Sequence, residues 1–147
     1  MAARAQLGKV HWIVILFFVL LAAFAVVALA PVVSKLRQPP AVRTAVRFME
    51  LLRQNKLQEA AQLLDPAVPK EKRDLKKVLD ERSLFWGTIE KVTVVDYVEN
   101  PADLKHPKAR EGVRVDFHLQ CYLSQGSAFV YLVPQNGKWV IVDYVLQ

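Results

Sequence analysis

Two side chains with complementary acid–base chemistry, Asp116 and His118, stand two positions apart in a run of alternating apolar and polar residues. Residues i and i+2 of a strand share a face of the sheet, so this carboxylate can orient the imidazole for proton transfer. The apolar residues of the same strand should meet the helices, which puts the polar row on the outer face of the sheet. We therefore predict that the row faces a partner protein rather than a catalytic pocket. It comprises Arg114, Asp116, His118, Gln120 and Tyr122.

The remaining residue types give no catalytic, cofactor-binding or metal-binding motif. The three histidines, His11, His106 and His118, are scattered, and no HxxxH, HExxH or DxDxDG spacing occurs. The single cysteine, Cys121, excludes an intrachain disulfide and a CxxC site. Its apolar neighbours indicate a buried, inert thiol. We expect no cofactor, no metal ion and no enzymatic activity.

The elements that position these residues change character at Gly87. Before it, the apolar residues Val42, Ala45, Val46, Met49 and Leu52 recur with helical periodicity and predict a first helix. Further helices are expected over 57–64 and 71–84, because Asp65-Pro66 stops the first of these.

After Gly87, β-branched and alternating residues predict strands over 88–98, 113–123, 128–133 and 138–146. A polar loop over 100–111 separates the first two, and Asn136-Gly137 indicates a type I′ hairpin. Helices followed by consecutive antiparallel strands predict an α+β, cone-like domain whose helices cover one face of a curved sheet.

The N-terminal part is strongly apolar, with no charged residue over 10–34. Residues 12–30 would form a helix of about 28 Å, close to a hydrocarbon core of about 30 Å. We therefore predict a basic tail (1–9), a transmembrane helix (10–33), a linker (34–40) and a soluble domain (41–147). The expected membrane anchor includes Trp12, Phe17, Phe18 and Phe24. The alternative is a cleaved signal peptide, because Ala28-Leu29-Ala30 resembles a cleavage site, but the apolar run is longer than such peptides require.

This layout predicts a single-pass protein of a cell inner or plasma membrane. A signal anchor would place the C-terminal domain on the outer side, periplasmic or extracellular, in a bacterial envelope. The positive-inside count alone favours the cytoplasmic side, but this count weakens for long translocated segments.

The net charge of +6 is concentrated in the helical half. Residues 35–86 carry 12 Lys or Arg against 7 Asp or Glu, and residues 87–147 carry 6 against 7. We interpret this basic half as a contact with anionic membrane lipids. Nucleic acid is the disfavoured alternative, because the charges lack interleaved aromatic residues.

The domain resembles the nuclear transport factor two-like superfamily, which includes SnoaL-like and ketosteroid-isomerase-like proteins. The resemblance rests on VRFMELLRQNKLQEAAQLLDPAV (46–68), on GVRVDFHLQC and on the ending NGKWVIVDYVL, and covers about 41–147. A cystatin-like domain is the alternative fold. The superfamily hosts enzymes, binders and scaffolds, and its membrane-tethered members resemble scaffold proteins of envelope machines. Its isomerases use a buried acid, for which Asp96 and Asp143 are the candidates, although a position at the rim with a local partner is favoured for both.

Three function hypotheses follow. The first is a non-enzymatic interaction module, an accessory subunit or assembly factor that binds other subunits of a membrane complex. The second is a domain that binds a small apolar ligand or acts as a sensor, and the third is an isomerase- or dehydratase-like enzyme. The aromatic residues that would line a ligand pocket are Phe117, Phe129, Tyr131, Trp139 and Tyr144.

Overall fold

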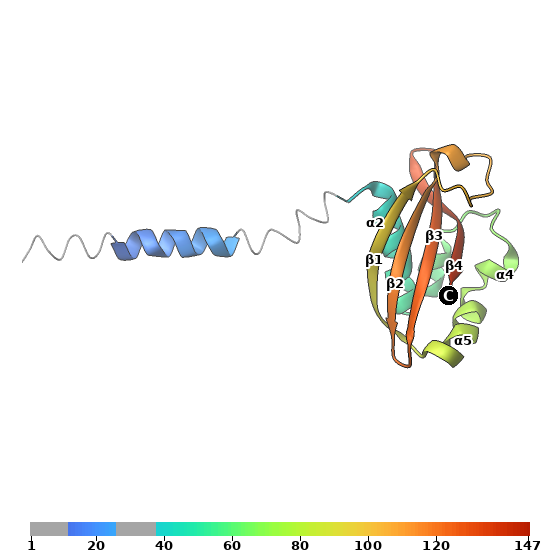
Figure 1. Ribbon diagram of the computed structural model, residues 1–147, viewed down its shortest axis with the longest axis horizontal. Coiled ribbons are helices and arrows are strands. Elements are labelled where there is room, and N and C mark those ends of the chain that lie inside the picture. The colour runs from blue at the N-terminus through green and yellow to red at the C-terminus, as the bar shows by residue number, and fades with distance from the viewer. Residues whose placement is uncertain (1–11, 26–37) are drawn as a thin grey trace, which may run out of the picture. The chain divides into compact units, whose positions relative to one another are not determined.

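The computed structural model describes residues 12–25 and 38–147 of the chain. The chain divides into two units, Met1–Gln38 and Pro39–Gln147. In the first unit, residues 12–25 are helical (Figure 1). The second unit holds all the other helices and strands described below. The predicted tail over 1–9 lies outside the described residues, as does most of the predicted linker.

The predicted transmembrane helix over 10–33 is wrong. Within 12–25 and 38–147, none of the helices combines the length and the apolar character that crossing a membrane requires. Residues 10, 11 and 26–33 of the predicted span lie outside the described part of the chain.

The predictions that depended on this span are corrected with it. They are the assignments to a single-pass membrane protein, to a signal anchor and to an inner or plasma membrane with an outward-facing domain. The four residues predicted as the membrane anchor lie in the helical stretch 12–25, each more than 60% exposed: Trp12, Phe17, Phe18 and Phe24.

The first helix of the domain, α2 (Pro40–Arg53), forms where the apolar periodicity predicts it. A proline in its first turn needs no hydrogen-bond partner for its nitrogen. The helix ends before Asn55, which adopts a positive φ of 57°. Its apolar stripe is buried and consists of Ala41, Val42, Ala45, Phe48, Met49, Leu51 and Leu52.

The other predicted helices are shorter than expected. The helix α3 (Leu57–Ala61) stops early because the chain after it turns onto the sheet, where Leu64 forms a parallel bridge with Ile141. The predicted helix over 71–84 is divided into α4 (Lys70–Arg73) and α5 (Leu75–Trp86). Asp74 lies between them in a non-helical conformation, and its side chain accepts a hydrogen bond from the backbone N–H of Lys77. An aspartate in this position caps the new helix.

Four strands follow: β1 (Ile89–Glu99), β2 (Val113–Cys121), β3 (Gln125–Gln135) and β4 (Lys138–Leu146). They form one antiparallel sheet in the order β1-β2-β3-β4 (Figure 1). The turn between β3 and β4 is made by Asn136 and Gly137, both with positive φ as a type I′ turn requires. The domain is therefore α+β, with its helices before its sheet as predicted.

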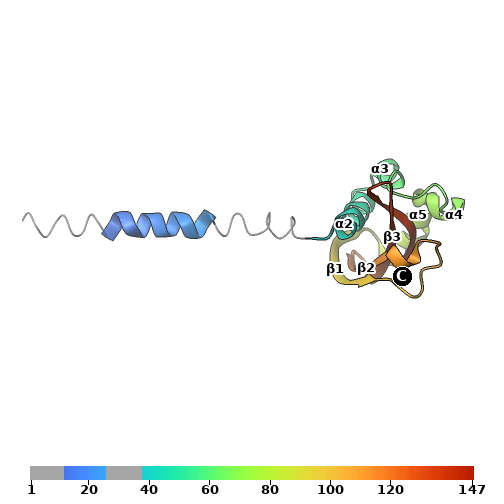
Figure 2. The ribbon, with the colours of Figure 1, turned by 90° about the horizontal axis from the view of Figure 1, so that it is seen from above.

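The main core lies between α2 and one face of the curved sheet, which we call the inner face (Figure 2). At its centre, the ring centroids of Phe48 and Tyr144 lie 5.4 Å apart. The strand β2 contributes its alternate apolar residues, including Cys121, to this layer. Burial raises the pKa of the Cys121 thiol, which keeps it in the unreactive protonated form.

We predict that Phe48→Ala lowers the free energy of unfolding of the full-length chain by about 3–5 kcal/mol, because it leaves a cavity in this core. Chemical denaturation followed by circular dichroism measures the change. The matched control is Phe85→Ala, whose ring is 74% exposed and whose loss should cost within about 0.5 kcal/mol. Equal effects of the two substitutions would contradict the assigned core.

Candidate functional site

The outer face of the sheet, opposite α2, carries the polar row that the sequence singles out. Arg114, Asp116, His118 and Gln120 alternate along β2 with the buried residues of the inner face. Arg114 and Asp116 are partly buried, whereas His118 and Gln120 are exposed. Tyr122 lies beyond the end of β2 and is 73% exposed. Four of the five residues predicted to face a partner therefore share this face.

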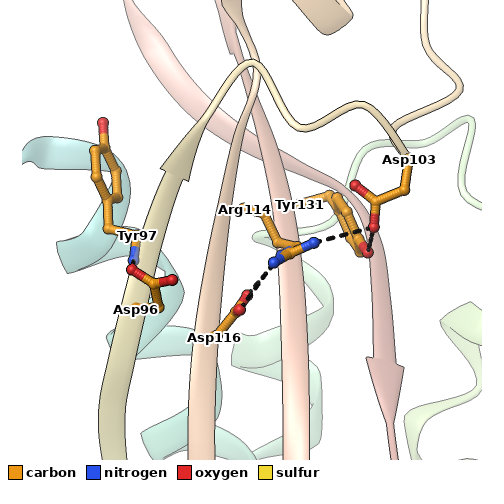
Figure 3. Close-up of polar contacts among 6 residues, drawn as sticks. All are labelled: Asp96, Tyr97, Asp103, Arg114, Asp116 and Tyr131. Carbon is orange, nitrogen blue, oxygen red and sulfur yellow. Dashed lines mark hydrogen bonds and ion pairs between the residues drawn. The ribbon is translucent and has the colours of Figure 1, made fainter.

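Arg114 is the centre of a polar network on the outer face (Figure 3). Its Nε and Nη2 donate to the two carboxylate oxygens of Asp116 at 2.7 and 3.0 Å, and its Nη1 lies 3.3 Å from Oδ2 of Asp103. The guanidinium also lies over the ring of Phe129, 5.6 Å from its centroid. These hydrogen bonds with Asp116 raise the pKa of Arg114. Arg114 thus ties the segment after β1 to the middle of the sheet.

Tyr131 of β3 completes this network. Its hydroxyl donates to Oδ2 of Asp103 at 2.6 Å. Burial of the phenol, together with the acceptor carboxylate, raises the pKa of Tyr131 to about 12. In return, the Tyr131 hydroxyl and then Arg114 lower the pKa of Asp103. No local pattern in the sequence indicates this contact, because Asp103 and Tyr131 are far apart along the chain.

The segment held by Arg114 covers a second, smaller apolar cluster on the outer face. Leu104, from the loop between β1 and β2, packs there with Tyr131 and Val133 of β3. The short 3-10 helix η1 (Ala109–Glu111) lies in the same loop and adds Ala109. Apolar side chains of β3 and β4 complete the cluster. A second, smaller hydrophobic core is therefore built on part of the outer face.

The acid–base arrangement considered for Asp116 and His118 is not assembled. Both oxygens of Asp116 accept hydrogen bonds from Arg114, and its side chain is only 15% exposed. In the described part of the chain, His118 has no hydrogen-bond partner on its side chain and is exposed. Asp116 therefore orients an arginine and not the imidazole.

The other two candidate acids have local partners. Asp96 accepts a hydrogen bond from the backbone N–H of Tyr97 at 2.8 Å (Figure 3). Asp143 accepts one from the backbone N–H of Tyr144 at 2.8 Å and pairs with Lys72 at 2.5 Å. Neither carboxylate is a buried, unpartnered acid of the kind that proton abstraction needs.

The five aromatic residues considered for a ligand pocket are divided between the two faces. Phe117, Trp139 and Tyr144 pack in the main core against α2. Phe129 and Tyr131 lie in the smaller cluster on the outer face. The structure therefore does not bring the five together around one space.

Two segments that meet where α5 stops and β2 turns into β3 carry four exposed large apolar residues. We call this surface the apolar tip; it consists of Leu84 (77% exposed), Phe85 (74%), Tyr122 (73%) and Leu123 (62%). The backbone N–H of Leu123 donates to the carbonyl of Trp86 at 2.9 Å, which holds the hairpin against the end of α5.

The glycine between α5 and β1 permits this close approach. Gly87 has a φ of 71°, and a Cβ at this position would lie 3.1 Å from Cβ of Tyr122. The sequence indicates the apolar tip only weakly, through the run Leu84-Phe85-Trp86 at the end of a helix and Tyr122-Leu123 at the edge of a turn. Only the fold shows that Trp86 is buried while its two predecessors are exposed.

Two further features concern metals and unsatisfied groups. Across 12–25 and 38–147, no three side chains of His, Cys, Asp or Glu converge as metal ligands would. In the same residues, every buried side-chain nitrogen or oxygen has a hydrogen-bond partner. The described residues thus offer exposed apolar surface rather than an unpaired polar centre.

No family model, curated protein or solved structure matches the chain. The resemblance to the nuclear transport factor two-like superfamily therefore stays a prediction from residue patterns.

We predict that Arg114→Met lowers the free energy of unfolding by about 1–3 kcal/mol, because the partly buried Asp116 carboxylate loses its partner. Denaturation of the full-length chain measures the loss. Adding Asp116→Asn to this variant should recover part of the stability, since the amide carries no charge. The control is Lys76→Ala, which breaks an exposed helix pair with Asp80 and should cost less than about 0.5 kcal/mol. A loss no larger than that of Lys76→Ala would refute the anchoring role of Arg114.

We also predict that Tyr131→Phe raises the pKa of Asp103 toward its ordinary value of 3.8, because the hydroxyl that stabilises the charged carboxylate is removed. The carboxyl carbon resonance of Asp103, followed against pH, measures this change. A lowered pKa in the folded state stabilises the fold above the ordinary pKa, and this contribution is lost as the pH falls through the folded value. Tyr97→Phe, whose hydroxyl lies near Glu99 instead, should leave the titration of Asp103 unchanged.

Proposed function

We propose that the Pro39–Gln147 domain is a non-enzymatic protein-interaction domain, and that its partner is a protein that binds the apolar tip. The observation that carries this proposal is the exposure, by 62% or more, of four large apolar residues in two segments that meet at one end of the domain: Leu84, Phe85, Tyr122 and Leu123. Single exposed apolar residues are ordinary, but clustered large ones are typical of protein–protein interfaces.

The composition of the apolar tip supports a protein partner. Two of its four side chains, Phe85 and Tyr122, are aromatic. Phenylalanine and tyrosine bury much area with few rotatable bonds, and aromatic residues are enriched at interfaces. Such a surface loses little conformational entropy when a partner covers it.

The apolar tip is also held rigidly by the core beneath it. Trp86 is only 8% exposed, and its ring packs close to the position that a Cβ of Gly126 would occupy. The backbone N–H of Tyr122 donates to the carbonyl of Thr88 at 2.9 Å. The tip therefore presents its side chains from a helix end and a hairpin that are fixed relative to one another.

The polar groups of the domain argue against an enzyme. Asp116 is paired with Arg114, and the Cys121 thiol is buried with a raised pKa. The hypothesis of an apolar ligand requires space between α2 and the inner face of the sheet. The side chains of Phe48 and Met49, both fully buried, fill this layer. An accessory subunit or assembly factor of a larger protein complex is the role that this surface supports best.

The test is affinity purification of the full-length chain from its native cells, with the partner identified by mass spectrometry. The tag belongs at the N-terminus, because Gln147 pairs with Ser127 in the hairpin close to the tip. The tip variant is Phe85→Asp with Leu123→Asp, and the matched control is Val95→Asp, a 66% exposed residue on β1.

We expect wild type and control to recover one stoichiometric protein that the tip variant loses. Losing even one central contact of about 2 kcal/mol weakens affinity about 30-fold, and the tip variant removes two. Equal thermal unfolding of the three chains shows that the loss is not due to misfolding. A partner that the tip variant retains, or the absence of any stoichiometric partner, overturns the proposal.

A further inference from the structure

A cavity of about 400 Å³ lies on the outer face, apart from the residues of the apolar tip. Its walls come from three parts of the chain: the segment 65–72 after α3, the segment 103–106 after β1, and outward residues of β3 and β4. The volume falls within the range of about 300–1,000 Å³ that small-molecule sites occupy.

Part of the cavity lining is apolar. Val142 and Val145 of β4 line it together with Val68, and Leu104 lines the side formed by the loop. Val68 and Leu104 are buried, at 2% and 9% exposure. An aliphatic chain or an aromatic ring bound there would remove apolar surface from water, which is favourable.

The carboxylates that line the cavity are already engaged. Asp65 accepts from the backbone N–H of Ala67 and from the amide of Gln135. Asp103 accepts from Tyr131 and Arg114, as described above, and Asp143 accepts from Lys72 and from the backbone N–H of Tyr144. Each carboxylate thus has two donors within the domain, and these bonds hold the walls in place before any ligand binds.

Lys72 at the cavity is paired with Asp143, but two other basic residues of the lining, Lys105 and His106, have donors left over. Lys105 lines it and, among the described residues, has no hydrogen-bond or ion-pair partner for its Nζ. His106 accepts the backbone N–H of Lys108 at Nδ1 (3.1 Å), which leaves Nε2 as a donor. In α4, beside the lining residue Lys72, Lys70 and Arg73 carry further positive charge. Free donors and positive charge favour an anionic group at this rim.

We propose that this cavity binds a small amphipathic carboxylate. Its apolar body lies against Val142 and Val145, and its carboxylate is held by Lys105 and His106. A cationic ligand fits less well, because Asp103 and Asp143 already pair with Arg114 and Lys72, and Asp65 accepts two hydrogen bonds within the domain. Among the described residues, Lys105 has no such counter-charge. This site is independent of the apolar tip and of its protein partner.

The experiment is a titration of the isotope-labelled full-length chain, monitored by amide resonances, with octanoate and separately with octylammonium. These two probes share the same chain length and differ in charge. We expect octanoate to shift the amides of Leu104, Val142 and Val145 saturably, and octylammonium to bind at least tenfold more weakly. Equal binding of the two probes, or shifts confined to other residues, overturns the proposal.

Two variants and one control sharpen the result. Ala67→Trp fills the cavity from an exposed position and should abolish the octanoate shifts, whereas Lys105→Glu should weaken binding at least tenfold. The control is Ala102→Trp, also exposed but outside the lining, which should bind like wild type. An unperturbed spectrum of each free variant shows that it folds. Wild-type affinity in Ala67→Trp would mean that octanoate binds elsewhere.

Discussion

Phe48 of α2 and Tyr144 of β4 meet at the centre of the layer between helix and sheet, with their rings 5.4 Å apart. Fully burying one large apolar side chain contributes about 1.5–3 kcal/mol, so this layer supplies most of the driving force for the domain. Tyr144 also links the core to the periphery, because its hydroxyl donates to the carbonyl of Lys72 at 2.6 Å. The position of α4, and with it one wall of the outer cavity, thus depends on the same core.

The sheet is covered on both faces, but unequally. Antiparallel sheets commonly leave one face to solvent, and here β1 and β2 do so around His118. Over β3 and β4, the loop between β1 and β2 covers the smaller apolar cluster, with Leu104 packed into it. Fixing this loop on the sheet costs conformational entropy, which other interactions must offset. Part of the offset comes from Arg114, which binds Asp116 through two hydrogen bonds and also contacts Asp103 of the loop.

The polar groups of the domain mainly stabilise the fold, and this determines which surfaces are left for function. The carboxylates with the right chemistry for catalysis, Asp116 and Asp143, are used to hold loops and helices against the sheet. What stays uncommitted is apolar at one end of the domain and cationic beside the cavity. Surfaces of these two kinds favour binding over chemistry, which is why both proposals concern recognition.

The sequence by itself determined the elements whose signals are local. The helical stripe of α2, the alternation along β2 and the Asn136-Gly137 turn each depend on neighbouring residues, and each is observed where predicted. The predicted membrane span was wrong, since no helix within residues 12–25 and 38–147 is long and apolar enough to cross a membrane. The sequence also placed Asp116 and His118 on one face without revealing that Arg114 would take the carboxylate.

Only the tertiary structure decided the contacts between distant segments. The sequence pattern suggested one pocket lined by aromatic residues of β2, β3 and β4. In the structure, Phe129 and Tyr131 of β3 lie in the outer cluster instead, and the pairing of β3 with β4 shifts register after Tyr131. The pairing of Asp103 with Tyr131, the joining of α5 to the β2–β3 hairpin, and the cavity all link residues that no local pattern relates. Such contacts form because packing the whole chain determines which segments become neighbours, and that information is distributed over the core.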